Sequence, residues 1–176
     1  LSVDWHARMY GELAIISSQC EDGWICPCSE EKIPTYDTWA ILLIAKALVV
    51  YFDCSADARI PAVIYRTMKN YYDLLSAGTI KLFGWTAFRW YEGFIALEFL
   101  QERYDEPWIL ELGKILQQQG VDYDKLIPLW EQPLDKWEFE THLVNTVMML
   151  KQEAVSCDML GLPYTDRAER YHQLLQ

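Results

Sequence analysis

One stretch of this sequence, residues 39–52, strongly limits how the chain can fold. It is fourteen residues long, and Lys46 is its one charged residue. A helix that is apolar almost all the way round must be surrounded by other parts of the protein. A membrane span needs about 20 apolar residues, which this run does not reach. The sequence therefore predicts a buried helix in a core that is built from neighbouring helices.

The same pattern recurs along the chain as an apolar helix, a short polar turn, an amphipathic helix and a longer connection. The helices are predicted at residues 4–18, 38–53, 60–75, 88–103, 109–118, 141–160 and 165–176, with a long loop at 121–140. The turns between paired helices fall near Asp57, Asp105 and Pro163, about 48 and 58 residues apart. Period-two alternation typical of strands is absent from the sequence. The chain is thus predicted to be a single all-α segment, residues 1–176, built from helical hairpins.

Length and charge restrict the classes of function. A chain of 176 residues with 52% hydrophobic residues can bury a substantial core as one domain. Its formal net charge is −11. Nucleic-acid binders need a basic surface, so a nucleic-acid partner is excluded, and an anionic membrane surface is disfavoured for the same reason.

The cysteines carry little evidence for a metal or a disulfide framework. They are odd in number, and Cys26-Pro27-Cys28 has no second Cys or His pair at ligand spacing nearby. Reduced thiols are therefore expected, which favours a cytoplasmic location without fixing the compartment, and no metal site is predicted. No signal peptide is visible. The chain starts without Met and in mid-pattern, which fits processing or a piece of a longer protein.

The most informative polar residues lie at the first turns of the three apolar helices. In stacked hairpins these turns face the loops at one end of the molecule. They carry the predicted substrate-binding residues Asp37, Trp39, Arg89, Trp90, Glu92, His142 and Asn145. A Trp ring covers the apolar face of a sugar, and charged or amide groups bind its hydroxyls. The pattern therefore favours a carbohydrate-binding cleft.

Simpler structural roles remain open for these residues. Arg89 and Glu92 are three apart and could pair as helix neighbours, which contributes only a few tenths of a kcal/mol. A lone His on an apolar helix, such as His142, is often a core residue, and Asn145 could orient it. Glycoside hydrolysis normally needs two positioned carboxyl groups. Glu92, Glu138 and Glu140 are available but cannot be paired by spacing, so no catalytic residue is assigned.

Four segments together resemble a known family. They are Glu21-Asp22-Gly23-Trp24, Tyr36-Asp37-Thr38-Trp39, the hairpin from Arg89 to Gln119, and His142-Leu143-Val144-Asn145. In this order and spacing they resemble the β-L-arabinofuranosidase-like family, glycoside hydrolase family 127 and its relatives, across nearly the whole chain. The resemblance implies an (α/α)6 toroid, the six-hairpin fold of such glycosidases. It also implies that Arg89, Glu92 and His142 contact the sugar.

The sequence also departs from that family. Well-studied members use a cysteine nucleophile, a glutamate acid/base and a zinc held by a glutamate and cysteines, in a Glu-x-Cys segment and a later Cys pair. Neither pattern occurs here, and the surroundings of Cys157 do not match. By chain order those elements are expected beyond Gln176. The resemblance thus implies zinc for a complete family enzyme and no cofactor for this chain.

The resulting expectation is part of a toroid. A six-hairpin ring needs about twice this length, so the chain is expected to form an open arc with exposed apolar faces. The rest of a catalytic domain, or self-association, would cover those faces. The predicted function is a glycoside hydrolase of the β-L-arabinofuranosidase type, to which this chain supplies part of the sugar cleft. The alternative is a non-catalytic helical-repeat module that binds protein or carbohydrate.

Overall fold

The computed structural model describes residues 14–136 and 141–174, and every regular element in these ranges is a helix. The α-helices are α2 (Trp39–Ser55), α3 (Ile60–Ser76), α4 (Gly84–Phe88), α5 (Gly93–Gln101), α6 (Pro107–Gln119), α7 (Ile127–Trp130), α8 (Leu143–Met148), α9 (Gln152–Leu160) and α10 (Arg167–Leu174). Short 3-10 helices are η1 (Glu30–Thr35), η2 (Trp90–Glu92), η3 (Tyr123–Lys125), η4 (Leu134–Lys136) and η5 (Met149–Lys151). The all-α prediction is confirmed. Most of the helix predicted at 4–18 lies outside the described residues.

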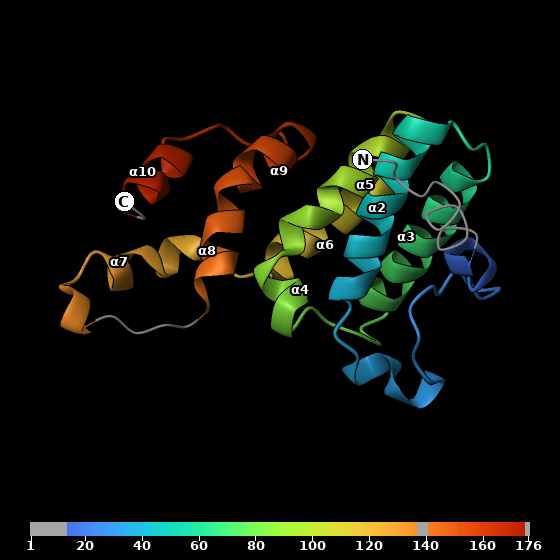
Figure 1. Cartoon of the computed structure of the whole chain (residues 1–176), viewed down its shortest axis with the longest axis horizontal. Coiled ribbons are helices and arrows are strands. Elements are labelled where there is room, and N and C mark those ends of the chain that lie inside the picture. Colours follow the sequence, from blue (N-terminus) through green and yellow to red (C-terminus); the bar gives the residue numbers. More distant parts are fainter. Residues whose placement is uncertain (1–13, 137–140, 175–176) are drawn as a thin grey trace, which may run out of the picture.

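Two hairpins, α2 with α3 and α5 with α6, form a bundle, which is at the right in Figure 1. The chain leaves α2 through Ala56, whose left-handed backbone (φ 52°) ends the helix, and Pro61 lies in the first turn of α3. Pro107 opens α6 in the same way. Proline is tolerated there because the first amides of a helix have no partner within it. These turn residues make the helices antiparallel neighbours.

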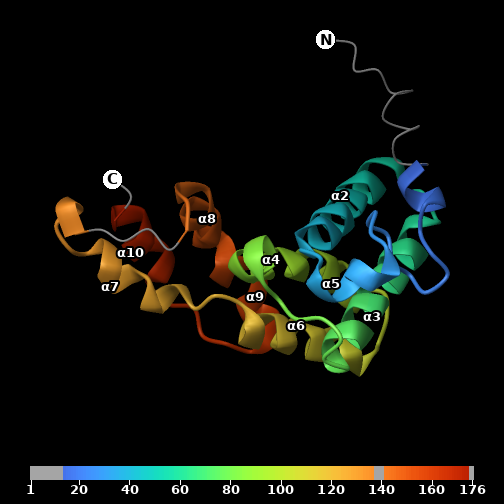
Figure 2. The ribbon, with the colours of Figure 1, turned by 90° about the horizontal axis from the view of Figure 1, so that it is seen from below.

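A third hairpin, made of α8, η5 and α9 with α10 packed against it, extends the row. Helix α9 packs on α5, α6 and η2, while α10 packs back on η5. Figure 2 shows α2 and α8 on either side of α4, with α3 and α6 below them in that view. The described residues thus form an open row of hairpins. The closed (α/α)6 toroid stays a prediction.

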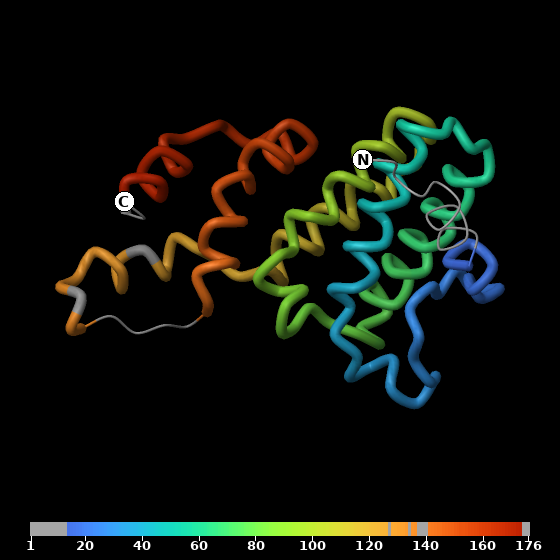
Figure 3. The backbone as a smooth tube through the Cα atoms, in the orientation of Figure 1, coloured from blue at the N-terminus to red at the C-terminus, as the bar shows by residue number. Residues whose placement is uncertain are grey.

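Three predicted elements differ from the structure, and the first is the helix predicted at 88–103, which is divided into the end of α4, η2 and α5. Residues 141–160 were expected to be one helix, but η5 separates α8 from α9 (Figure 3). No Pro or Gly occurs at this point, and the turn instead directs Lys151 towards the buried Glu92. The long connection predicted at 121–140 contains η3, α7 and η4 in its described part. Local periodicity does not report contacts between distant residues, such as that of Lys151 with Glu92.

The core between the hairpins is dominated by large side chains. Leu42, Tyr71, Phe94, Leu97 and Leu112 are all fully buried. No helix within the described ranges is long and apolar enough to cross a membrane.

Candidate carbohydrate-binding site

The starts of α2, α4 and α8 lie at the same end of the molecule. In Figure 1 α2, α4 and α8 all begin at the lower edge. The link between the second and third hairpins is a hydrogen bond from Arg89 Nε to Asn145 Oδ1 (2.7 Å), across 56 residues of sequence. Arg89 lies between α4 and η2 with a non-helical backbone (φ −121°, ψ 25°). It therefore sits at a break between helices and not inside the long helix that was predicted.

Two tryptophan rings contact this arginine. The Arg89 guanidinium carbon is 4.7 Å from the Trp39 ring centroid and 5.1 Å from that of Trp85. Such cation–π contacts fix the plane of the guanidinium and are worth about 0.5–2 kcal/mol each. We refer to Trp39, Trp85 and Arg89 as the aromatic clamp. It joins the start of α2 to α4.

A single carboxylate positions both tryptophans. Asp37 accepts hydrogen bonds from the backbone amide of Trp39 (Oδ1, 3.1 Å) and from that of Trp85 (Oδ2, 3.0 Å). The Thr86 hydroxyl also donates to Asp37 Oδ1 (2.7 Å). The carboxylate satisfies amides at the starts of two helices, where no backbone acceptor is available. Asp37 therefore sets the position of the clamp and has no oxygen that lacks a protein partner.

A network of buried hydroxyl groups lies next to the aromatic clamp. The Thr38 hydroxyl lies 3.0 Å from the Tyr71 hydroxyl and 3.2 Å from that of Thr86. All three side chains are buried. Because buried polar groups are costly to leave unpaired, this network ties α2, α3 and α4 together under the clamp.

The third hairpin contributes His142 and Asn145. Asn145 is fully buried, and its amide nitrogen donates to the Thr141 hydroxyl, which leaves its oxygen to accept from Arg89. His142 is exposed, and its ring meets the Trp85 ring edge-on at 4.5 Å. His142 is thus not a core residue, and it extends the clamp towards solvent.

Trp90 lies apart from the clamp. Its side chain is only 2% exposed, and its indole nitrogen donates to the backbone oxygen of Val121 (3.3 Å). The ring packs so closely on Gly120 that a Cβ there would lie 2.1 Å from it. The tight 3-10 turn of η2 directs neighbouring side chains to different sides, so that Trp90 points into the core.

Glu92 also points away from the clamp. It is fully buried, and its carboxylate pairs with Lys46 Nζ (2.8 Å) on α2 and with Lys151 on η5. Within the described chain its ion pairs are with these lysines and not with Arg89. Glu92 therefore joins the first and third hairpins through charge. The simple Arg89–Glu92 helix pair does not form.

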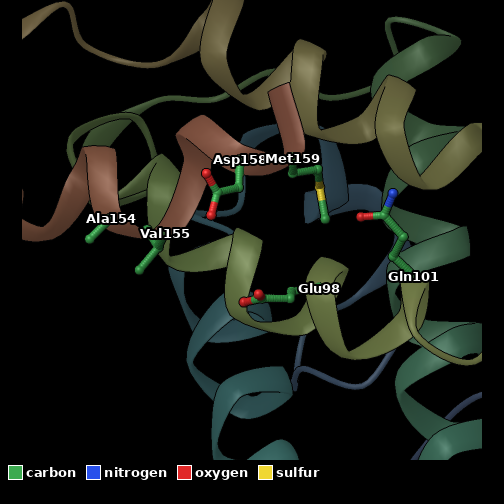
Figure 4. A pocket seen from close by; sticks show the side chains of 6 residues that line it. All are labelled: Glu98, Gln101, Ala154, Val155, Asp158 and Met159. Atoms are coloured by element: carbon green, nitrogen blue, oxygen red, sulfur yellow. The ribbon is translucent and has the colours of Figure 1, made fainter. Parts of the chain in front are cut away.

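A separate hollow of about 230 Å³ lies further along α5 (Figure 4). Glu98 and Gln101 of α5 line one side, and Asp158 and Met159 of α9 line the other. Its two carboxylates are exposed, and the sequence prediction did not include them. They were missed because pairing Glu98 with Asp158 requires knowing how α9 packs against α5.

The cysteines show no metal-binding arrangement in the part of the chain that the structure describes. No group of three or more His, Cys, Asp or Glu side chains is gathered there for a metal ion. Cys26 is buried, and this burial raises the pKa of its thiol to about 12, with a smaller contribution from nearby Cys28. A neutral thiol is a poor metal ligand and a poor nucleophile. The zinc implied for the complete family enzyme stays a prediction.

Of the predicted site residues, the structure brings together Asp37, Trp39, Arg89, His142 and Asn145, and it separates Trp90 and Glu92 from them. Trp85 is a clamp residue that the prediction missed. Its signal in the sequence was a Trp directly after Gly84, since glycine often marks a turn before a helix. In the structure Gly84 has a left-handed backbone (φ 53°) at the start of α4. Comparison with protein-family models, with curated proteins and with solved structures finds no match.

Proposed function

We propose that this chain binds carbohydrate at the aromatic clamp, as one wall of a glycoside-hydrolase-like sugar cleft. The observation that carries the proposal is the contact of Arg89 with Trp39, Trp85 and Asn145, which joins three hairpins at one place. Trp85 is 39% exposed, so part of its ring is available to the apolar face of a sugar. The resemblance of the sequence to the β-L-arabinofuranosidase-like family supports the same function.

The chemistry of the clamp favours binding over bond cleavage. Glycoside hydrolysis usually needs one carboxyl group to protonate the leaving group and a second to attack or activate water. Among the described residues, Asp37 is the carboxylate at the clamp, and its oxygens are occupied by three protein donors. Glu92 is enclosed between two lysines. We therefore assign sugar positioning to this face and no catalytic role.

The test is titration calorimetry of the 176-residue chain with arabinose, xylose and galactose derivatives and their oligosaccharides. We expect binding to at least one, and Trp85→Ala should weaken it about five- to thirtyfold, because a stacking ring contributes roughly 1–2 kcal/mol. Tyr164→Ala is the matched control, since Tyr164 is an exposed aromatic residue outside the clamp. Absence of binding to the whole panel would contradict the proposal, as would equal losses in both variants.

A second candidate function, protein binding, is favoured by one observation. Helices α2 and α8 expose large apolar side chains, namely Leu43, Val50, Leu143, Val144 and Val147. Exposed apolar groups on this scale mark interaction surfaces in many proteins. A complex isolated with no carbohydrate bound, and insensitive to Trp85→Ala, would favour this alternative.

A further inference from the structure

The charge of Arg89 is not neutralised by the residues around it. Among the described residues, the guanidinium makes one hydrogen bond, through Nε, and no ion pair. Its two terminal amino groups therefore lack a protein acceptor in these ranges. The chain carries 26 acidic and 15 basic residues, so an arginine without a carboxylate partner is unexpected. The terminal amino groups are not among the buried atoms that lack a partner, so an anionic ligand can reach them from solvent.

A second arginine in the same bundle shows the contrast. Arg103 also lies against two aromatic rings, 3.7 Å from the Phe99 centroid and 5.2 Å from that of Phe52. Its terminal nitrogen, however, pairs with Glu102 (2.9 Å) and donates to the Phe99 backbone oxygen (2.7 Å). The fold thus supplies acceptors to one arginine held between aromatic rings. For Arg89 it supplies an acceptor to Nε alone, and the described residues offer none to the two terminal amino groups.

The groups nearest to Arg89 are neutral or already engaged. Asp37 accepts from the amides of Trp39 and Trp85 and from the Thr86 hydroxyl, and it makes no ion pair with Arg89. Tyr91 and Tyr123 interact electrostatically with Arg89. Burial nevertheless raises the pKa of both phenols, so they stay neutral. Asn145 uses its oxygen on Nε and its nitrogen on Thr141. The two terminal amino groups of Arg89 remain for a ligand.

We infer that the carbohydrate is acidic, with a uronic acid carboxylate bound by the terminal amino groups of Arg89. The inference rests on the proposed function and names its substrate class. The fork of a guanidinium matches a carboxylate in a bidentate arrangement. Trp39, Trp85 and Asn145 hold that fork in one plane, so little side-chain freedom is lost on binding. The sugar ring attached to the carboxylate then lies against the exposed part of Trp85.

The experiment compares a galacturonic acid trisaccharide with the galactose trisaccharide of the same linkage, by calorimetry on the 176-residue chain. We expect the acidic trisaccharide to bind at least about tenfold more tightly, the effect of one charge-assisted contact. The preference should shrink as salt is raised from about 50 to 500 mM, because added ions screen the charges. Arg89→Gln should abolish the preference, and Arg89→Lys should keep only part of it, because lysine offers a point charge.

Arg103→Gln is the matched control and should leave the preference unchanged. Equal affinity for the two trisaccharides overturns the inference while the proposed function stands. Binding of neither, together with failure of the neutral panel, overturns the proposed function itself. If Arg89→Gln does not fold, the wild-type preference, its salt dependence and Arg89→Lys still decide the question.

Discussion

Asp37 organises the aromatic clamp through the backbone amides that it accepts from. Its carboxylate binds the backbone amides of Trp39 and Trp85, the two residues whose rings contact Arg89. Gly84 lets the chain approach this carboxylate, because a Cβ at that position would lie 2.9 Å from Asp37 Oδ2. The geometry of the clamp is therefore fixed by a short-range contact at its base.

Replacing this carboxylate tests that role. Asp37→Ala removes the acceptor of two helix-start amides and should lower the free energy of unfolding by about 1–2 kcal/mol. Urea denaturation followed by tryptophan fluorescence measures the change. Asp53→Ala, which removes an exposed carboxylate near the other end of α2, should change stability by less than about 0.5 kcal/mol. Similar losses in both variants would contradict the assigned role.

The buried thiol of Cys26 predicts that the free energy of unfolding depends on pH. Burial raises its pKa from 9.0 to about 12, so the folded chain holds this proton more tightly than the unfolded chain does. Between about pH 9 and 12 the unfolded chain binds fewer protons, and the free energy of unfolding therefore falls as pH rises. Below pH 9 this contribution is fully present.

Alkylation measures the same property directly. At pH 8 iodoacetamide should label the exposed Cys20 and Cys54 well before Cys26, whose thiol is neutral and enclosed. Peptide mass mapping over time gives each rate. Labelling of Cys26 as fast as Cys54 in the folded chain would show that the thiol is accessible and ionised, against this account.

At the scale of elements, apolar periodicity predicts a helix well where consecutive helices of the sequence pack against each other. Helices expected at 38–53 and 60–75 are observed as α2 and α3, within two residues at each end. The apolar run at 141–160 gives the same signal, yet η5 interrupts it where Lys151 reaches Glu92. A contact between residues 59 positions apart is invisible to a window of one helix.

The close contact between Gly120, at the end of α6, and Trp90 of η2 predicts that a larger side chain at Gly120 lowers stability. A Cβ at Gly120 would lie 2.1 Å from Trp90 Cδ1, so Gly120→Ala must displace the indole from the core. We expect a loss of about 1–3 kcal/mol in the free energy of unfolding, the usual effect of overpacking. Gln118→Ala replaces an exposed side chain in the last turn of α6 and should be nearly neutral. Thermal unfolding monitored by circular dichroism separates the two, and a neutral Gly120→Ala would argue against the tight contact.

At the scale of the whole molecule, Glu92 holds the hairpins together. Its buried carboxylate pairs with Lys46 of the first hairpin and Lys151 of the third. Glu92→Gln leaves two ammonium groups facing a neutral amide. We expect a loss of about 2–3 kcal/mol, below the usual value for a broken buried pair because both lysines are partly exposed.

The matched control for this variant is Glu111→Gln, which breaks the exposed pair with Lys114 and should cost less than about 0.5 kcal/mol. Denaturation by urea compares the two. If Glu92→Gln were as mild as Glu111→Gln, the charge bridge between hairpins would contribute nothing to the fold.

The candidate site was predictable only in part from the sequence. Equivalent positions in repeated hairpins pointed to Trp39, Arg89, His142 and Asn145. In the structure Trp39 and Asn145 contact Arg89, and Arg89 and His142 contact Trp85. Trp90 and Glu92 share the same sequence segment as Arg89, but the turn at η2 sends one into the core and the other to the lysines. Helix periodicity cannot give side-chain directions in a non-helical break, and it cannot pair residues from separate hairpins.

The most direct test of carbohydrate binding at the clamp is an NMR titration of the indole N–H signals. Each tryptophan gives one such signal, and Trp39 and Trp85 can be assigned by substitution. On addition of an acidic oligosaccharide, we predict that the signals of Trp39 and Trp85 shift in proportion to saturation while that of the buried Trp108 stays in place. Shifts confined to tryptophans outside the clamp, or no shift at saturating sugar, would contradict the account.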